Sequence, residues 1–325
     1  MVKRVERANK ARNRSLKSFL IDNAAMLMCI LLVIYNAIFS PNFLKIFTLW
    51  NLLSQTAALM FAAMGMTLVI SCGCTDLSIG SVMAISSSVC GTLMRANVNS
   101  GAAILVTLVL CAGIGVLNGF MVARLRIQPM VAMLVSRMVW RAVANIYTKG
   151  ITQSIRTDGI VRFIAQTRIT ELRMPMIIFP MILIVLVTLF IVKKMRLGRK
   201  IEAVGNNQRT AYLCGVSVAG TIMTVYVLSS VFAAFGGLLE LFRSSSMDSN
   251  TIGVDFEMFA IAAATIGGTN MRGGKAKVMG SVFGALLMTL ITMTVNYANI
   301  TYEMANVFKA AVIVFAIALQ SSEKA

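Results

Sequence analysis

Long apolar runs, separated by short polar or basic segments, make up most of this chain. Most runs have about 17–25 residues, the length at which an α-helix crosses the hydrocarbon core of a bilayer. They contain Gly and Ala and do not alternate polar with apolar residues, so the pattern predicts helices and not barrel strands. The sequence predicts ten transmembrane helices, at residues 24–40, 51–70, 81–95, 101–123, 128–147, 176–192, 218–241, 255–270, 278–297 and 303–320.

Two of the predicted helices are short, and each adjoins a break rich in Gly and polar residues. The first break, SCGCTDLSIG at 71–80, precedes span 81–95; the second, TIGGTNMRGGKAK at 265–277, overlaps the end of span 255–270. Paired interrupted segments, one in each half of a membrane protein, are typical of a translocation site near the middle of the bilayer. Irregular backbone at that depth must be buried in protein or line a cavity, so the pattern favours a transporter.

The composition agrees with a membrane location. Of the 325 residues, 58% are hydrophobic and 13% are charged, and the mean hydropathy is +0.81. A soluble domain usually has about 25% charged residues. We therefore expect an all-α polytopic membrane protein, with a basic arm at 1–20 and a single transmembrane domain at 21–322. No small-residue cleavage site follows the first apolar run, so we expect that run to remain as a membrane span.

The formal net charge of +18 lies mainly in segments between the apolar runs. The arm at 1–20 and the loop at 193–217 are strongly basic, and ten helices place both on one side together with both termini. Because Lys and Arg are enriched in cytoplasmic loops, this side is expected to be the cytoplasm. Segment 148–175 is also basic, yet the same layout places it outside as a folded external segment. Aromatic residues are not interleaved with these charges, so we expect no nucleic-acid partner.

Side chains that carry enzyme chemistry are scarce. The chain has no His, and its six Cys fall mostly in apolar stretches, where we expect them to pack as small hydrophobic residues. Residues 273–275, Gly-Gly-Lys, resemble the end of a phosphate-binding loop, but Ala276 stands where such a loop needs Ser or Thr. Gly280 and Gly284 instead predict a close helix contact. We expect no ATPase site, no metal and no cofactor in this chain.

A polar stretch, GRKIEAVGNNQRTAYLCGVSV at 198–218, occupies the basic loop. Its residues 209–213 predict a short helix that ends at Gly215. A short helix outside the membrane, between two spans, suits a docking surface for another protein. The residues alone are equally consistent with a solvated connector.

Four motifs, in this order along the chain, resemble those of one transporter family. GMTLVISCGCTDLSIGSVMAIS at 65–86 is similar to the pattern GMTxVIxTGGIDLSVGSVxAL. The other three are GVLNGFMVARLRIQPMVAML at 115–134, EAVGNNQRTAYLCGVSV at 202–218 and IGGTNMRGGKAKVMGSVFGALL at 266–287. Over about residues 50–320 the chain thus resembles the permease subunits of bacterial sugar-importing ABC transporters, the ribose, xylose and galactofuranose group.

The resemblance implies partners and a location. Such permeases reside in the bacterial cytoplasmic (inner) membrane, with membrane lipid around them and about ten helices in each subunit. They pair with a second permease copy or a paralogue. A cytoplasmic ATP-binding subunit supplies energy, and an external solute-binding protein delivers the sugar.

The resemblance also implies roles for particular residues. Coupling to the ATPase is expected at Glu202, Ala203, Gly205, Asn207, Ala211 and Gly215. The translocation path or its signature is expected at Asp76, Ser78, Asn118, Arg141, Gly267, Gly268 and Thr269. The chain departs from the family pattern at Cys74, Thr75, Met133 and Ala276, which leaves the identity of the solute open.

Four polar side chains inside predicted spans or breaks have two interpretations each. Asp76 either accepts a hydroxyl of the solute or, as we favour, caps a helix that begins near Ser78. Arg137 and Arg141 share one helix face and should point into the bundle or toward water. A further hypothesis is that one of them pairs with Asp76. Asn118 either meets the solute or, as we favour, joins neighbouring helices.

Two classes of function fit these features. The first is the permease subunit of an ATP-driven sugar importer, which works by alternating access and hydrolyses nothing itself. The second is a self-sufficient secondary transporter or channel for a small polar solute, which would need its own ion-coupling residue. Asp76 is the one carboxylate placed for that role in the predicted layout.

Overall fold

The computed structural model describes residues 24–40, 43–155, 159–169 and 173–298, and a few positions between 304 and 314. The predicted arm at 1–20 lies outside the described residues, as does most of the predicted span 303–320. The first half contains helices α2 (Ala24–Phe39), α3 (Ile46–Ser71), α4 (Ile79–Arg95), α5 (Ser100–Ala123), α6 (Pro129–Thr148) and α7 (Gly159–Gln166). The second contains α8 (Ile178–Lys193), α9 (Arg196–Asn206), α10 (Gln208–Leu213), α11 (Val218–Ser244), α12 (Phe256–Ile266) and α13 (Val278–Tyr297).

Helices form at each predicted span from 24–40 to 278–297, which confirms the mostly helical fold class. By length and composition, α3, α5, α11 and α13 can each cross a membrane, and α8 with α9 adds a fifth span if this pair, bent by 70°, counts as one. The described residues therefore support a polytopic helical protein but do not establish ten spans. The short helices α4 and α12 each adjoin one of the predicted breaks.

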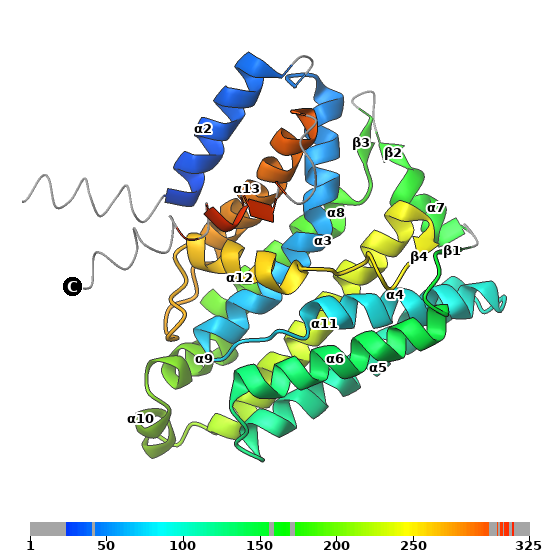
Figure 1. Cartoon of the computed structure of the whole chain (residues 1–325). Helices are drawn as coiled ribbons and strands as arrows, with labels where there is room; N and C mark the ends of the chain where they lie inside the picture. The colour runs from blue at the N-terminus through cyan, green and yellow to red at the C-terminus, as the bar shows by residue number, and fades with distance from the viewer. Residues whose placement is uncertain are drawn as a thin grey trace, which may run out of the picture.

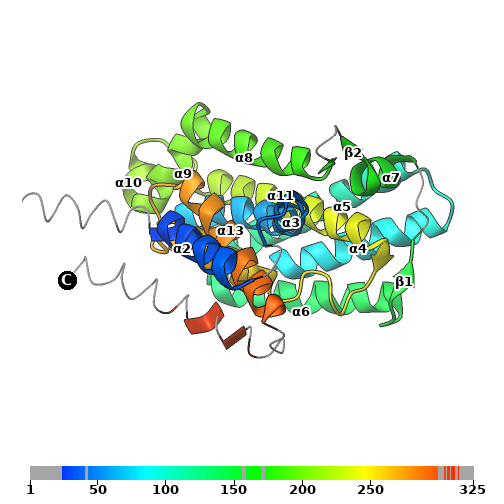
Figure 2. The same cartoon turned by 90° about the horizontal axis from the view of Figure 1, so that it is seen from above.

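Helix α11 lies at the centre of the bundle. It packs against α3, α4 and α5, while α6 and α8 lie along opposite edges (Figure 2). Helix α2 packs against α13 and leaves large apolar side chains such as Ile30, Leu31 and Ile34 exposed. An apolar surface of this kind suits contact with lipid and not with water.

Glycines allow several helices to approach closely. Gly267 lies against the backbone of Gly280, and Gly284 lies against the backbone of Ala263, so a Cβ at any of these glycines would overlap main-chain atoms. These contacts join α12 to α13 and confirm the small-residue helix contact predicted at Gly280 and Gly284.

The two ends of the bundle carry different small elements (Figure 1). Helices α9 and α10 lie at one end. At the other end, β1 (Gln153–Ser154) pairs with β4 (Ser246–Met247), and α7 lies beside β2 (Arg168–Ile169) and β3 (Met174–Pro175). The described part of segment 148–175 thus contains regular secondary structure, and its place outside the membrane stays a prediction.

Candidate functional site

The first break brings a carboxylate into the middle of the bundle. Helix α3 ends at Ser71, Gly73 has a φ of +78°, and Asp76 is fully buried. One carboxylate oxygen of Asp76 accepts hydrogen bonds from the N–H and the hydroxyl of Ser78, at 2.9 and 2.6 Å. The other accepts the hydroxyl of Ser229 in α11, at 2.7 Å. Both oxygens are therefore occupied by donors from the protein.

These bonds extend into a chain of buried polar side chains. The Asn118 amide of α5 donates to the Ser78 hydroxyl at 2.9 Å, and the hydroxyl of Ser136 in α6 donates to the Asn118 oxygen at 2.7 Å. Asp76, Ser78, Asn118, Ser136 and Ser229, called the polar network below, thus connect α5, α6 and α11 at the start of α4. In this arrangement Asn118 joins helices, as the sequence analysis favoured.

The favoured role of Asp76 needs a correction in detail. Helix α4 begins at Ile79, and its N-cap is Ser78, whose own side chain makes no capping bond. Asp76 accepts the Ser78 N–H two residues on, so it closes an Asx turn that leads into the helix and does not cap the free N–H groups of the first helical turn. The hypothesis that an arginine pairs with Asp76 is wrong in this structure, because Arg137 pairs with Glu257 and Arg141 donates to backbone carbonyls.

The N-terminal ends of α4 and α12 meet inside the bundle. The backbones of Gly80 and Gly253 touch, and a Cβ on Gly80 would overlap both the Gly253 carbonyl and the Glu257 carboxylate. Two short helices whose N-terminal ends converge inside a membrane protein are the arrangement expected at a translocation site. The sequence predicted the paired breaks but not this contact.

Two arginines of α6 hold this junction together. The Arg137 guanidinium lies 2.8 Å from a carboxylate oxygen of Glu257, whose side chain is fully buried, while that of Arg137 is 32% exposed. Arg141 donates to the carbonyls of Ser249 and Ile252 at 2.7 and 2.8 Å and to that of Gly80 at 3.2 Å. Gly80, Arg137, Arg141, Gly253 and Glu257 are called the half-helix junction below.

Arg141 was a predicted site residue, and the contacts of both arginines confirm that they point into the bundle or toward water. Glu257 was not predicted. The signal was present, because an acidic residue inside an apolar span needs a partner. Ser136, Ser229 and the buried Tyr226 were not predicted either; the Tyr226 hydroxyl donates to the Thr75 carbonyl at 2.9 Å.

The second break lies at the same end of the molecule as α9. Gly267 ends α12, and Gly268 has a φ of +90°, a backbone conformation that favours glycine. The Thr269 side chain is buried, and its hydroxyl accepts the N–H of Lys277 at 3.2 Å. These three predicted site residues therefore form the turn between α12 and α13.

The two breaks meet at Gly205. The Gly274 N–H donates to the Ser71 carbonyl at 2.9 Å, and a Cβ on Gly205 would overlap the Ser71 carbonyl and crowd the Gly274 nitrogen. Beside it, a Glu202 carboxylate oxygen accepts the Ala276 N–H at 3.3 Å. The predicted coupling residues Glu202 and Gly205 thus face inward, onto both breaks; this contact is called the break junction below.

The predicted short helix forms next to this junction. Asn207 is the N-cap of α10 and accepts the Thr210 N–H at 3.0 Å, and Gly215, with a φ of +78°, follows its end. Ala203 is half-buried and Ala211 is buried, whereas Tyr212 and Leu213 are 71% and 77% exposed. A cavity of about 970 Å³ lies between α10, the loop from α5 to α6, and the backbone of the first break. Tyr212 lines this cavity, whereas Leu213 is exposed without lining it.

Other chemistry is not apparent among the described residues. No group of three or more acidic or Cys side chains in the described part of the chain is arranged to hold a metal ion. Five cysteines are buried, as expected, whereas Cys214 is exposed.

Comparison with known proteins places the chain in a family. The family described as "Branched-chain amino acid transport system / permease component" matches residues 48–317. The ribose import permease protein RbsC of Escherichia coli is 31% identical, over 95% of this chain and 96% of that protein. The galactose/methyl galactoside import permease MglC of Escherichia coli is 30% identical, over 94% of this chain and 96% of that protein.

The galactofuranose transporter permease YtfT of the same organism is 34% identical, over 83% of this chain and 79% of that protein. No solved structure matches the chain. The family match covers most of the chain and contains both breaks, the half-helix junction and the coupling segment. The resemblance found in the sequence is thereby confirmed, and this chain belongs to the branched-chain amino acid transport system / permease component family.

Proposed function

We propose that this chain is the membrane-embedded subunit of an ATP-driven importer and forms the translocation path for a sugar. The observation that carries the proposal is the break junction. Gly205, in the last turn of α9, touches the backbone of both interrupted segments, so movement of α9 would be transmitted to both breaks. A self-sufficient transporter has no ATP-binding subunit whose movement this contact would transmit.

The docking partner in this proposal is a cytoplasmic ATP-binding subunit. Tyr212 and Leu213 on α10 are exposed, and α10 lies within the basic segment 193–217, which we expect on the cytoplasmic side. Tyr is among the residue types enriched at the energetic centres of protein interfaces. The ATP-binding subunit would hold α10, and its closure on ATP would move the break junction.

The solute path in this proposal runs along the half-helix junction. Arg137 is partly exposed on a face of α6 that also carries the exposed Leu134 and Met138. A charged group on a membrane helix is costly against lipid, so this face should border water or another protein subunit. A second permease copy or a paralogue, packed against this face, would enclose a path lined by the Arg137 guanidinium.

The solute is proposed to be a sugar because the relatives named above import ribose, galactose or galactofuranose. The family description instead names branched-chain amino acids. The proposed topology has ten spans in the bacterial inner membrane with both termini in the cytoplasm. An external solute-binding protein delivers the solute.

Reconstitution tests the proposal. The chain is placed in proteoliposomes alone, or with a cognate ATP-binding subunit and solute-binding protein, and uptake of labelled ribose, galactose and leucine is measured. We expect sugar uptake only with both partners and ATP, and none of leucine. Sugar uptake by the chain alone under an ion gradient would refute the importer proposal, and leucine uptake by the full assembly would refute the solute class.

A further inference from the structure

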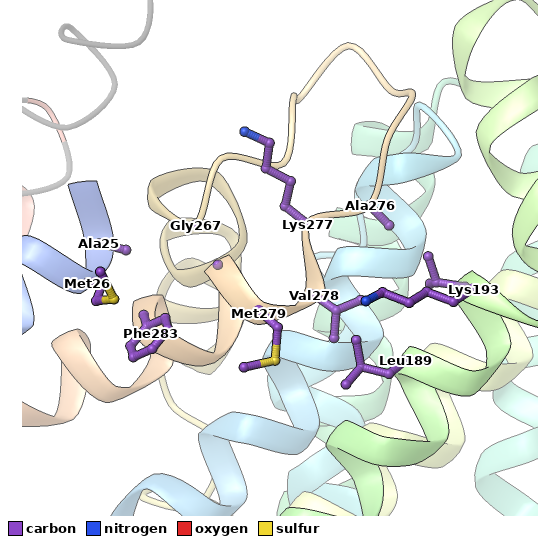
Figure 3. Close-up of a pocket in the computed structure, with 12 residues that line it drawn as sticks. Ala25, Met26, Leu189, Lys193, Gly267, Ala276, Lys277, Val278, Met279 and Phe283 are labelled. Atoms are coloured by element: carbon purple, nitrogen blue, oxygen red, sulfur yellow. The ribbon is translucent and has the colours of Figure 1, made fainter. Parts of the chain in front are cut away.

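A cavity unrelated to the polar network lies on the outside of the bundle, at the end that carries α9. It has a volume of about 300 Å³, at the lower end of the range for ligand sites. Its walls come from the first turn of α2, the last turns of α8, and the start of α13 (Figure 3). These elements are far apart in the sequence, so the cavity is a seam between three helices.

The walls are apolar. Met26, Leu189, Val192 and Phe283 line the cavity, and Met279, 48% exposed, stands at its edge. Helix α2 beside it exposes several large apolar side chains, as a helix in contact with lipid does. The seam is therefore placed to receive an acyl chain from the surrounding membrane.

Two lysines give the seam a charge. Lys193, at the last residue of α8, and Lys277, just before α13, both line it, and no lining residue is acidic. Glu202 does not line the seam, but its carboxylate accepts the N–H of the lining residue Ala276. Figure 3 shows the two lysine side chains on different elements, with the apolar side chains between and below them.

We propose that this seam binds one anionic phospholipid, with an acyl chain against Met26, Leu189 and Phe283 and its phosphate beside Lys193 and Lys277. Basic pockets between membrane helices at the level of the headgroups are suited to such lipids. The basic N-terminal arm of the chain is a poor occupant, because its charge has the same sign as that of the lysines. A bound lipid would brace the turn between α12 and α13, since Gly267 and Gly280 also border the seam.

The test uses the purified full chain in detergent and two lipids that differ in the headgroup, phosphatidylglycerol and phosphatidylcholine with identical acyl chains. Native mass spectrometry gives the occupancy of each lipid, and thermal unfolding gives the stabilisation. Wild type should bind phosphatidylglycerol preferentially and unfold at a higher temperature with it. Equal binding of the two lipids would overturn the proposal without any variant.

Variants then locate the site. K193Q/K277Q should weaken phosphatidylglycerol binding about thirty-fold, the effect of about two lysines at an anionic membrane surface. The matched control is K194Q/K275Q, which removes two neighbouring exposed lysines that do not line the seam. K193R/K277R should bind as wild type does. Equal loss in the control pair, or full binding by K193Q/K277Q, would overturn the proposal.

A soluble headgroup separates lipid from free phosphate. Glycerol phosphate lacks the acyl chain, so it should neither stabilise the chain nor displace phosphatidylglycerol. If glycerol phosphate stabilises wild type as much as the lipid does, the seam is a phosphate site and the lipid proposal fails.

Discussion

The carbonyl oxygen of Ser71 faces the Cα of Gly205 so closely that no side chain fits on Gly205. Ser71 ends the helix before the first break, and Gly205 lies in the last turn of the helix before α10. The Gly274 N–H of the second break donates to the same carbonyl. The Ser71 carbonyl oxygen therefore joins the first break, the second break and α9, three segments that a coupled transporter has to move together.

Substitution of Gly205 by Ala tests the break junction. In a helix Ala is favoured over Gly by about 1 kcal/mol, but the added Cβ must overlap backbone atoms, and overpacking costs about 1–3 kcal/mol. We expect Gly205→Ala to lower the free energy of unfolding and to lower ATP-driven uptake at least tenfold. The control is Gly113→Ala in α5, where nothing lies within 4 Å of a built Cβ. Equal stabilisation by both substitutions would show that the contact at Gly205 is wrong.

The polar network allows a test of the bond between Asp76 and Ser229. A hydrogen bond to a charged group contributes about 1.5–3 kcal/mol, so Ser229→Ala should destabilise the chain by about that amount. In a double-mutant cycle with Asp76→Ala, the double variant should lose less stability than the sum of the two single losses.

The residue next to Ser229 provides the control for this cycle. The Ser230 hydroxyl is buried with no hydrogen-bond partner among the described residues, so Ser230→Ala should be neutral or stabilising. Chemical unfolding in detergent measures all four variants. A loss in Ser230→Ala as large as in Ser229→Ala would argue against the specific bond.

The apolar pattern predicted the positions of the helices well, because each run either crosses the bundle or stops at a break. It also predicted that Gly280 takes part in a close helix contact and that α10 ends near Gly215, since the spacing of small residues and a single glycine indicate these features. These features require only knowledge of the residues within one or two helical turns.

The partners of the buried polar groups could not be predicted in the same way. Asp76 meets Ser229, and Arg137 meets Glu257, across more than a hundred residues of chain. Apolar periodicity does not determine which helices become neighbours, and so the guess that an arginine pairs with Asp76 had no geometric support. The family resemblance assigned Glu202 to coupling, and its bond to the turn before α13 was not predicted, because that turn lies more than seventy residues further along the chain.

The ion pair of the half-helix junction predicts an asymmetry between its two partners. Arg137→Gln leaves the fully buried Glu257 carboxylate without its closest partner, whereas Glu257→Gln leaves an arginine that is 32% exposed and reaches water. Breaking a buried pair costs about 3–5 kcal/mol, and we expect a loss near this range for Arg137→Gln and a smaller one for Glu257→Gln. The double variant should be more stable than Arg137→Gln alone. The reverse order of the two single variants in unfolding experiments would contradict this geometry.

The exposed side chains of α10 predict a loss of binding without a loss of stability. Tyr212 and Leu213 are 71% and 77% exposed, so their truncation removes little buried surface, and Tyr212→Ala/Leu213→Ala should change the free energy of unfolding by less than about 0.5 kcal/mol. If they anchor the ATP-binding subunit, the same change should weaken its binding at least tenfold, because interface anchors contribute about 2 kcal/mol or more. Affinity for the isolated subunit can be measured on the chain held in nanodiscs.

Leu105 in α5 gives the matched control for this last experiment. It is 66% exposed, comparable to Tyr212, but lies in the half of α5 away from α10. Leu105→Ala should leave both stability and subunit binding unchanged. If the α10 variant binds the ATP-binding subunit as wild type does, the subunit docks elsewhere. Helix α10 would then not transmit its movement to Gly205 and the break junction. If both variants lose binding equally, the effect comes from general exposure of the apolar surface and not from α10.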